Sequence, residues 1–160
     1  MSLSAIPLIV LTVLIIGGWR NGSGDVQADP FISPVDMEKG KVSAPFGERV
    51  NPFTGKKEIH TGIDIEINAG EPVVAAAKGK VVTATSDEKR GNYVVIEHDN
   101  SFTTSYSHLK SLYVQSGDIV ESGKCIGFVG STGLSTGPHL HFEVLQNGKA
   151  INPAEHLPSR

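Results

Sequence analysis

The segment Ile63-Asp64-Ile65-Glu66-Ile67 alternates apolar and acidic residues with a period of two. This alternation is typical of a β-strand with one buried face, because successive side chains of a strand point to opposite sides. Short runs that also favour strands recur at 73–76, 81–83, 93–96, 102–106, 126–129 and 140–145, and turn signals rich in Gly, Asn and Asp separate them. No amphipathic pattern predicts a helix of ten or more residues, although 107–112 suits a short helical turn. The chain is therefore predicted to be mainly β, with an antiparallel sandwich or barrel-like core.

Length and charge limit the alternatives. A chain of 160 residues favours one folded domain, which we place at 42–160. The net charge of -3 gives no support for binding to nucleic acid, which usually requires a basic face. Cys125 is the single cysteine, so it forms no intramolecular disulfide. Its strand-like surroundings favour a buried, inert thiol over a nucleophile.

An apolar run at the N-terminus predicts a helix within residues 1–19. The run from Ala5 to Trp19 is shorter than the ~20 residues that span a bilayer comfortably, so it suits a signal peptide or a short membrane anchor. No basic residue precedes it, and the small-residue pattern Val26-Gln27-Ala28 lies far beyond it. Arg20 favours a cytoplasmic location for the residues after the run. One charge is little evidence, and we give more weight to the chemistry that the histidine motifs described below indicate for the domain. A buried core helix, or the last span of a longer membrane protein, are the alternatives.

Residues 20–41 have the composition of a flexible linker. Asn-Gly-Ser-Gly is followed by Asp, Pro and Ser residues without an apolar period. Fully extended, such a segment would reach ~75 Å, so a tethered domain would work some way from a membrane.

Four of the six histidines fall in three short motifs. His139-Leu140-His141 lies in a predicted strand, where residues i and i+2 share a face, so both imidazoles point into one space. One of them can bind an ion while the other addresses a substrate, and the spacing does not say which. His108 lies alone in 105–109. His98 and His156 are more typical of surface or structural histidines.

His60 and Asp64 form the remaining motif, His60-Thr61-Gly62-Ile63-Asp64. In a fully extended chain their Cα atoms would lie ~13 Å apart, too far to share one ion easily. We therefore predict a bend at Thr61-Gly62, where glycine adopts backbone angles that a side chain forbids, so that His60 folds back toward Asp64. Two histidines and one carboxylate make a catalytic zinc set with an open position for water. Zinc lowers the pKa of that water toward about 7, and the remaining histidines are candidate bases or hydrogen-bond donors.

These motifs together resemble the lysostaphin- and LytM-type peptidases of family M23, which are zinc endopeptidases of peptidoglycan. The similarity covers about Ser43 to Leu157. Its motifs are Ala44-Pro45-Phe46-Gly47-Glu48-Arg49, Pro52-Phe53-Thr54-Gly55, His60-Thr61-Gly62-Ile63-Asp64, Gly70-Glu71-Pro72-Val73-Val74-Ala75, Gly91-Asn92-Tyr93-Val94-Val95-Ile96, Tyr106-Ser107-His108-Leu109, the block from Gly130 to Glu143, and Asn152-Pro153. The block that contains His139 and His141 is highly specific.

The resemblance implies that His60, Asp64 and His141 bind one Zn²⁺ per chain. It implies that His108 and His139 are the catalytic pair, which activates water and steadies the oxyanion. It further implies a duplicated hybrid β motif, peptide stems or cross-bridges of peptidoglycan as substrates, and an extracytoplasmic bacterial protein, secreted or anchored in the membrane through its N-terminal segment.

The sequence departs little from the family pattern. Ser107 stands where alanine is common, and no separate wall-binding module is visible. Some members of the family have lost zinc ligands and act as non-catalytic modules that activate a separate cell-wall amidase, which is the alternative function. All five site positions are intact here, which favours the enzyme. Loops 48–58 and 87–91 are predicted to read the substrate.

Overall fold

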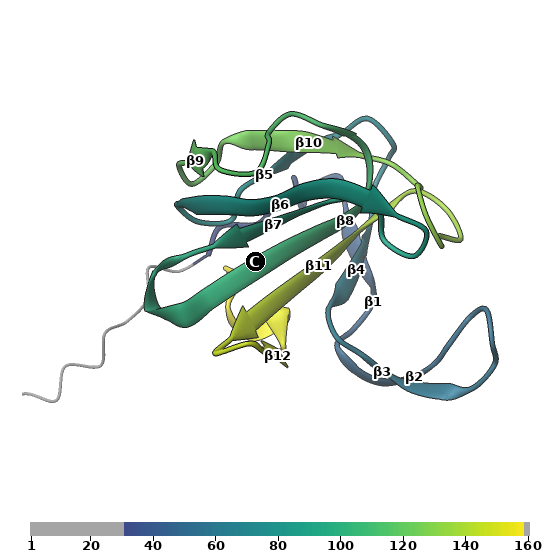
Figure 1. The fold of residues 1–160 in the computed structure, drawn as a ribbon. Coiled ribbons are helices and arrows are strands. Elements are labelled where there is room, and N and C mark those ends of the chain that lie inside the picture. Colours follow the sequence, from purple (N-terminus) through teal and green to yellow (C-terminus); the bar gives the residue numbers. More distant parts are fainter. Residues whose placement is uncertain (1–30, 159–160) are drawn as a thin grey trace, which may run out of the picture.

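The computed structural model describes residues 31–158, and in this part of the chain the fold is mainly antiparallel β-sheet (Figure 1). Its helical elements are two short 3-10 turns, η1 (Asp99–Ser101) and η2 (Pro153–Glu155). The strands are β1 (Lys41–Ala44), β2 (Gly47–Val50), β3 (Lys57–His60), β4 (Ile63–Glu66), β5 (Pro72–Val74), β6 (Gly79–Asp87), β7 (Gly91–Glu97), β8 (Phe102–Leu112), β9 (Ile119–Val120), β10 (Cys125–Val129), β11 (His139–Gln146) and β12 (Lys149–Ile151). The prediction of a mainly β, antiparallel fold is confirmed.

Ten of these strands form one branched sheet. Its main path runs β1-β4-β11-β8-β7-β6-β9, while β12 pairs with β11 and β5 joins through β10, which pairs with β8. The remaining strands, β2 and β3, form a separate hairpin that projects from the main sheet beside β1 and β4 (Figure 1). The sequence did not predict this hairpin, because its side chains lack a regular apolar alternation.

Strand β8 changes partners part-way along its length. Its first half pairs with β11, up to the register pair Ser107 and His141, and its second half pairs with β10 from Leu109 onward. Between the halves, His108 has a φ of 65°, in the left-handed region that few side chains adopt. The predicted helical turn at 107–112 is wrong, because these residues continue β8.

The two faces of β11 have different environments. Leu140, Phe142 and Val144 are fully buried in the hydrophobic core, and each contributes about 1.5–3 kcal/mol by leaving water. The alternate residues, His139 and His141 among them, lie on the opposite face. The core therefore holds one face of this strand in place and leaves the other face for polar side chains.

The described part of the segment that we predicted as a linker is packed against the domain. Phe31 and Val35 are each 4% exposed and belong to the hydrophobic core. The Phe31 ring lies 5.5 Å from that of Phe102 and 6.3 Å from that of His156. The packed region thus extends upstream of Val42, because Phe31 and Val35 bury their apolar side chains in the hydrophobic core.

The predicted N-terminal helix and residues 20–30 of the predicted linker lie outside the described residues. Between residues 31 and 158, no helix has the length and apolar character needed to cross a membrane.

Candidate metal centre and active site

The bend between β3 and β4 brings His60 back toward Asp64. β3 ends at His60 and β4 begins at Ile63, so Thr61 and Gly62 form the bend that the sequence predicted. The reason for glycine differs from the prediction, since Gly62 does not have a left-handed φ. Instead, a Cβ at this position would overlap the carbonyl oxygen of Phe142. Glycine is needed here because the bend passes so close to β11.

The pairing of β4 with β11 brings the carboxylate to the histidines. Asp64 lies directly opposite His141, and Glu66 lies opposite His139. Directly opposite side chains of an antiparallel pair point to the same face and are close neighbours. The strand register therefore gathers residues that are far apart in the sequence.

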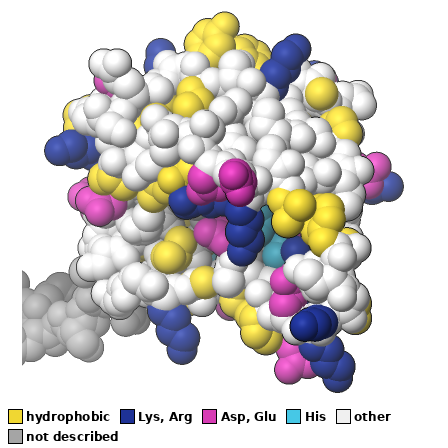
Figure 2. Space-filling model, turned by 45° about the vertical axis from the view of Figure 1, so that its right-hand side comes forward, with side chains coloured by type: hydrophobic (Ala, Val, Ile, Leu, Met, Phe, Trp, Pro, Cys, Tyr) yellow, Lys and Arg dark blue, Asp and Glu magenta, His cyan; other side chains and the backbone are white. Residues whose placement is uncertain are grey.

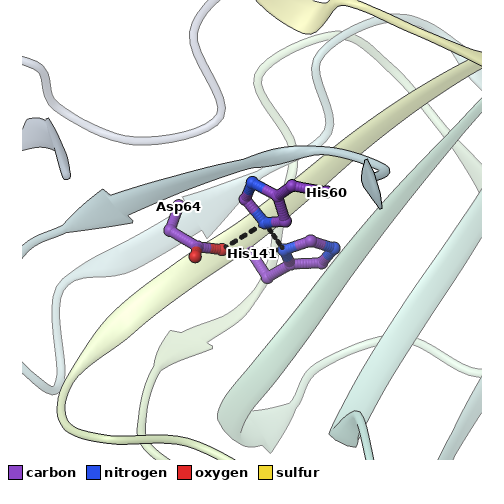
Figure 3. A group of neighbouring side chains, drawn as sticks. All are labelled: His60, Asp64 and His141. Atoms are coloured by element: carbon purple, nitrogen blue, oxygen red, sulfur yellow. Dashed lines mark hydrogen bonds and ion pairs between the residues drawn. The ribbon is translucent and has the colours of Figure 1, made fainter. Parts of the chain in front are cut away.

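Three ligand atoms converge in the space between these strands (Figure 3). His60 Nε2 lies 3.2 Å from Asp64 Oδ1 and 3.2 Å from His141 Nδ1, and His141 Nδ1 lies 2.7 Å from Asp64 Oδ1. Ligand atoms ~2.0–2.2 Å from a tetrahedral zinc ion would lie ~3.4 Å from one another. Two imidazoles and a carboxylate supply the donor set of a zinc site, and their ligand atoms already lie close together, somewhat nearer to one another than around a bound ion.

The other nitrogen of each of these two histidines is held by the protein. His60 Nδ1 donates to the carbonyl oxygen of Pro45 at 2.7 Å, and His141 Nε2 donates to Glu143 Oε1 at 3.1 Å. Thr61 Oγ1 also donates to this oxygen of Glu143. Such partners fix the tautomer of a metal-binding imidazole and orient its ring. They leave His60 Nε2 and His141 Nδ1 as the two nitrogens that face the cluster and that would bind a metal ion after losing any proton they carry.

The electrostatics of the cluster favour a positive charge. Burial is the largest single influence on the pKa of Asp64 and raises it, but the hydrogen bonds from His141 and His60 together hold this pKa well below its usual range. Burial lowers the pKa of His141, whereas its hydrogen bonds to Asp64 and Glu143 outweigh burial and raise the pKa to about 9. Two partly buried carboxylates therefore stabilise a cation at this point, whether an imidazolium or a metal ion.

His108 and His139 form a second pair beside the cluster, with ring centroids 4.7 Å apart. His108 Nδ1 donates to the carbonyl oxygen of Thr132 at 2.8 Å, and His139 Nδ1 donates to that of Gly137 at 2.8 Å. Burial is the main cause that lowers the pKa of His108. His108 is therefore neutral near pH 7, with Nε2 available to accept a proton.

These side chains lie in a groove of about 680 Å³. Both loops that we predicted to read the substrate contribute to its walls, the first through Phe53 and the second through Arg90. The exposed apolar side chains of Phe53, Ile59 and Leu134 line the same groove. Figure 2 shows histidine atoms in a hollow between hydrophobic and charged side chains. The groove has the size and mixed character of a binding site for a peptide.

A sequence model of "Peptidase family M23" matches residues 58–153, more than half of the chain. The chain belongs to peptidase family M23. Peptidoglycan DD-endopeptidase ShyC of Vibrio cholerae is 39% identical over 86% of this chain and 32% of its own length. DD-carboxypeptidase/endopeptidase Mpg of Neisseria meningitidis is 45% identical over 71% of this chain and 26% of its own length. The chain thus spans about a third or less of these relatives.

Solved structures of M23 peptidases share the fold. The crystal structure of a zinc-containing peptidase from Vibrio cholerae superposes with a TM-score of 0.72 and 37% sequence identity. The superposition covers 78% of this M23 chain and 39% of the Vibrio cholerae protein. This similarity confirms the resemblance inferred from the histidine motifs.

The structure brings all five predicted site residues of this M23 domain into the groove, and their individual roles remain predictions. The other histidines lie elsewhere: His98 bonds to the Lys78 carbonyl and the Thr104 hydroxyl, and His156 packs on aromatic rings. Cys125 lies in β10, partly buried, and does not line the groove.

Sequence reasoning missed the contacts of three residues in and around the cluster. Glu143 accepts from His141, Thr61 donates to Glu143, and Arg49 donates to Asp64. The position of Glu143 two residues after His141 was a usable signal, because both side chains must share one face of β11. Arg49 lay inside a quoted motif but offered no such periodic relation to Asp64.

Proposed function

We propose that this chain is a zinc metalloendopeptidase that hydrolyses peptide bonds in the stems or cross-bridges of bacterial peptidoglycan. One zinc ion per chain would be held by His60, Asp64 and His141. The observation that supports this most strongly is the convergence of these three ligand atoms in a groove that also contains His108 and His139. The relatives named as peptidoglycan endopeptidases support the choice of substrate.

Zinc, when bound, supplies a Lewis acid that lowers the pKa of water and polarises a carbonyl group. The protein supplies the proton transfers and the hydrogen bonds. His108 Nε2 is the proposed proton acceptor, because its Nδ1 is committed to the Thr132 carbonyl and the ring is neutral. His139 Nε2, 3.8 Å from Asp64 Oδ1, is directed at the same space. Because His139 Nδ1 donates to the Gly137 carbonyl, Nε2 donates only when the ring carries a second proton, and this imidazolium form is the proposed partner of the oxyanion. Removing one such stabilising group typically lowers kcat by ~10²–10³-fold.

The relatives are named as a DD-endopeptidase and a DD-carboxypeptidase/endopeptidase, which favours a peptide bond between two D-configured residues of a cross-link over a glycyl bridge as the bond that is cut. The apolar groove wall formed by Phe53, Ile59 and Leu134 would contact the aliphatic parts of the peptide.

We further propose that the protein acts outside the cytoplasm. The location of peptidoglycan supports this, as does the apolar run at 1–19, which would serve as a signal peptide or membrane anchor. Residues 20–30 would form the flexible part of the linker. The finer architecture would be the duplicated hybrid motif of the resemblance, in agreement with the branched antiparallel sheet.

The test is digestion of purified walls by the full zinc-loaded chain, with fragments identified by mass spectrometry. We expect cleavage of direct D-alanyl–diaminopimelate cross-links in preference to glycyl bridges, and loss of cleavage in His141→Ala. His156→Ala, which removes a histidine outside the groove, should retain activity. A chain that binds no zinc contradicts the proposal. A zinc-loaded chain that cuts no wall but stimulates a separate amidase supports the alternative, a non-catalytic activator.

A further inference from the structure

Arg49 connects the projecting hairpin to the candidate metal centre. It lies on β2, and its Nη1 donates to Asp64 Oδ2 at 2.9 Å. The two side chains are 27% and 15% exposed, so this ion pair is partly shielded from water. Within residues 31–158, Arg49 is the only hydrogen-bond donor to Asp64 Oδ2.

The guanidinium is itself held in place from within the hairpin. Arg49 Nε donates to Glu58 Oε1 at 2.8 Å, and Asn51 Nδ2 donates to Glu58 Oε2 at 2.7 Å. A planar guanidinium that makes bonds through two different nitrogens has little freedom to rotate. Arg49 therefore presents Nη1 to Asp64 in a fixed direction.

The two oxygens of Asp64 consequently have separate partners. Oδ1 faces His60 Nε2 and His141 Nδ1, at 3.2 and 2.7 Å, whereas Oδ2 faces Arg49. Carboxylates bind metal ions through one oxygen or through both. An oxygen that accepts a charge-assisted hydrogen bond is a weaker second ligand, because the same lone pairs and the same negative charge are shared.

We propose that Arg49 is a positioning residue that keeps Asp64 a one-oxygen ligand and so preserves an open coordination position for the reaction. This inference rests on the proposed function. Without Arg49, Oδ2 is free to turn toward the ion and occupy that position. The loss of a nearby positive charge also removes repulsion of the metal, so the metal should be retained while turnover falls.

Absorption spectroscopy of the Co²⁺-substituted full chain tests this inference without substrate. We expect intense visible bands, typical of four-coordinate Co²⁺, for the unmodified protein. In Arg49→Met we expect retained cobalt but clearly weaker bands, which indicate a higher coordination number. In the zinc form of this variant we expect kcat to fall about 10–100-fold with little change in KM. Arg49→Lys, which keeps the charge and one donor, should recover part of the band intensity.

Lys57→Met is the matched control, since Lys57 lies on the same hairpin and the change also removes one positive charge. Its spectrum should equal that of the unmodified protein. Unchanged bands in Arg49→Met overturn the inference, and so does complete loss of cobalt from a folded variant. If Arg49→Met does not fold, Glu58→Ala tests the inference instead, because it removes the carboxylate that fixes Arg49 Nε. Unchanged bands in Glu58→Ala also overturn the inference. Failure of the unmodified chain to bind any metal instead contradicts the proposed function.

Discussion

At the scale of single residues, every histidine of the groove has one ring nitrogen committed to the protein. Three of them donate Nδ1 to main-chain carbonyl oxygens, whereas His141 donates Nε2 to the carboxylate of Glu143. This difference explains why His141 presents Nδ1 to the cluster and the others present Nε2. The position of the hydrogen-bond acceptor behind each imidazole therefore decides which ring nitrogen faces the groove.

Glu143→Ala should weaken zinc binding about 10–100-fold, because His141 loses the acceptor that fixes its tautomer and ring orientation. Competition with a chromogenic chelator measures this affinity. Glu66→Ala is a suitable control, since Glu66 is an exposed carboxylate on β4 whose ion-pair partner is Lys41. Equal zinc affinities for both variants would contradict an orienting role for Glu143.

Zinc affinity should fall as the pH is lowered from about 9. Hydrogen bonds to Asp64 and Glu143 raise the pKa of metal-free His141 to about 9, so below that pH a proton must leave the ring before Nδ1 can bind zinc. The expected slope is on the order of tenfold in affinity per pH unit between pH 9 and 7. Calorimetric titrations at several pH values, in buffers of different ionisation enthalpy, measure both the affinity and the released protons. A constant affinity with no proton release would contradict a His141 that is protonated before it binds zinc.

At the scale of elements, the pairing of β4 with β11 is the arrangement on which the candidate site depends. The register places Asp64 opposite His141, and the tight bend before β4 delivers His60 to the same point. A one-residue slip would turn Asp64 to the other face of the sheet and separate it from His141. Because Gly62 lacks a side chain, the bend can pass close to the main chain of Phe142 on β11.

Gly62→Ala should therefore lower both stability and zinc affinity. The added Cβ would meet the Phe142 carbonyl oxygen, so the bend must move away from β11 at a cost of about 1–3 kcal/mol. Denaturant unfolding and zinc titration measure the two effects. Gly137→Ala is the control for stability, because an added Cβ there meets no atom within 4 Å and its φ is not left-handed. Equal stability of the two variants would mean that the contact at Gly62 is easily relieved.

At the scale of the whole molecule, one hydrophobic core supports the groove from behind and includes residues upstream of the predicted domain. The buried side chains of β4, β8 and β11 belong to the same cluster as Phe31 and Val35. The segment that precedes β1 is therefore part of the folded unit, so a domain cut at Val42 would remove two core side chains.

Phe31→Ala should lower the free energy of unfolding by about 3–5 kcal/mol, because it leaves a cavity in the core beside the buried ring of Phe102. Its neighbour Ile32 is 39% exposed, and Ile32→Ala should have a much smaller effect. Urea unfolding of the full chain compares the two. Similar losses in both variants would show that Phe31 contributes little to the core.

The sequence alone indicated the family and the mainly β class of fold, and it singled out the five candidate site residues. Period-two alternation and glycine-rich turns are local properties, so most long strands could be predicted, and the i, i+2 spacing placed His139 and His141 on one face. Strands β1, β2, β3, β9 and β12 could not be predicted, because they are short and their pairing partners, rather than their own patterns, hold them in the sheet. The helical turn at 107–112 was wrongly predicted because pairing with β10, a long-range contact, keeps these residues in β8.

Only the tertiary structure decided how distant residues meet. The register of β4 on β11 set the distances between His60, Asp64 and His141, and the partner change of β8 at His108 directed that ring into the same groove. The hydrogen bonds of Arg49, Thr61 and Glu143 also became visible only there. Ligand geometry depends on which strands pair and in what register, and these are long-range contacts that a one-dimensional pattern does not specify.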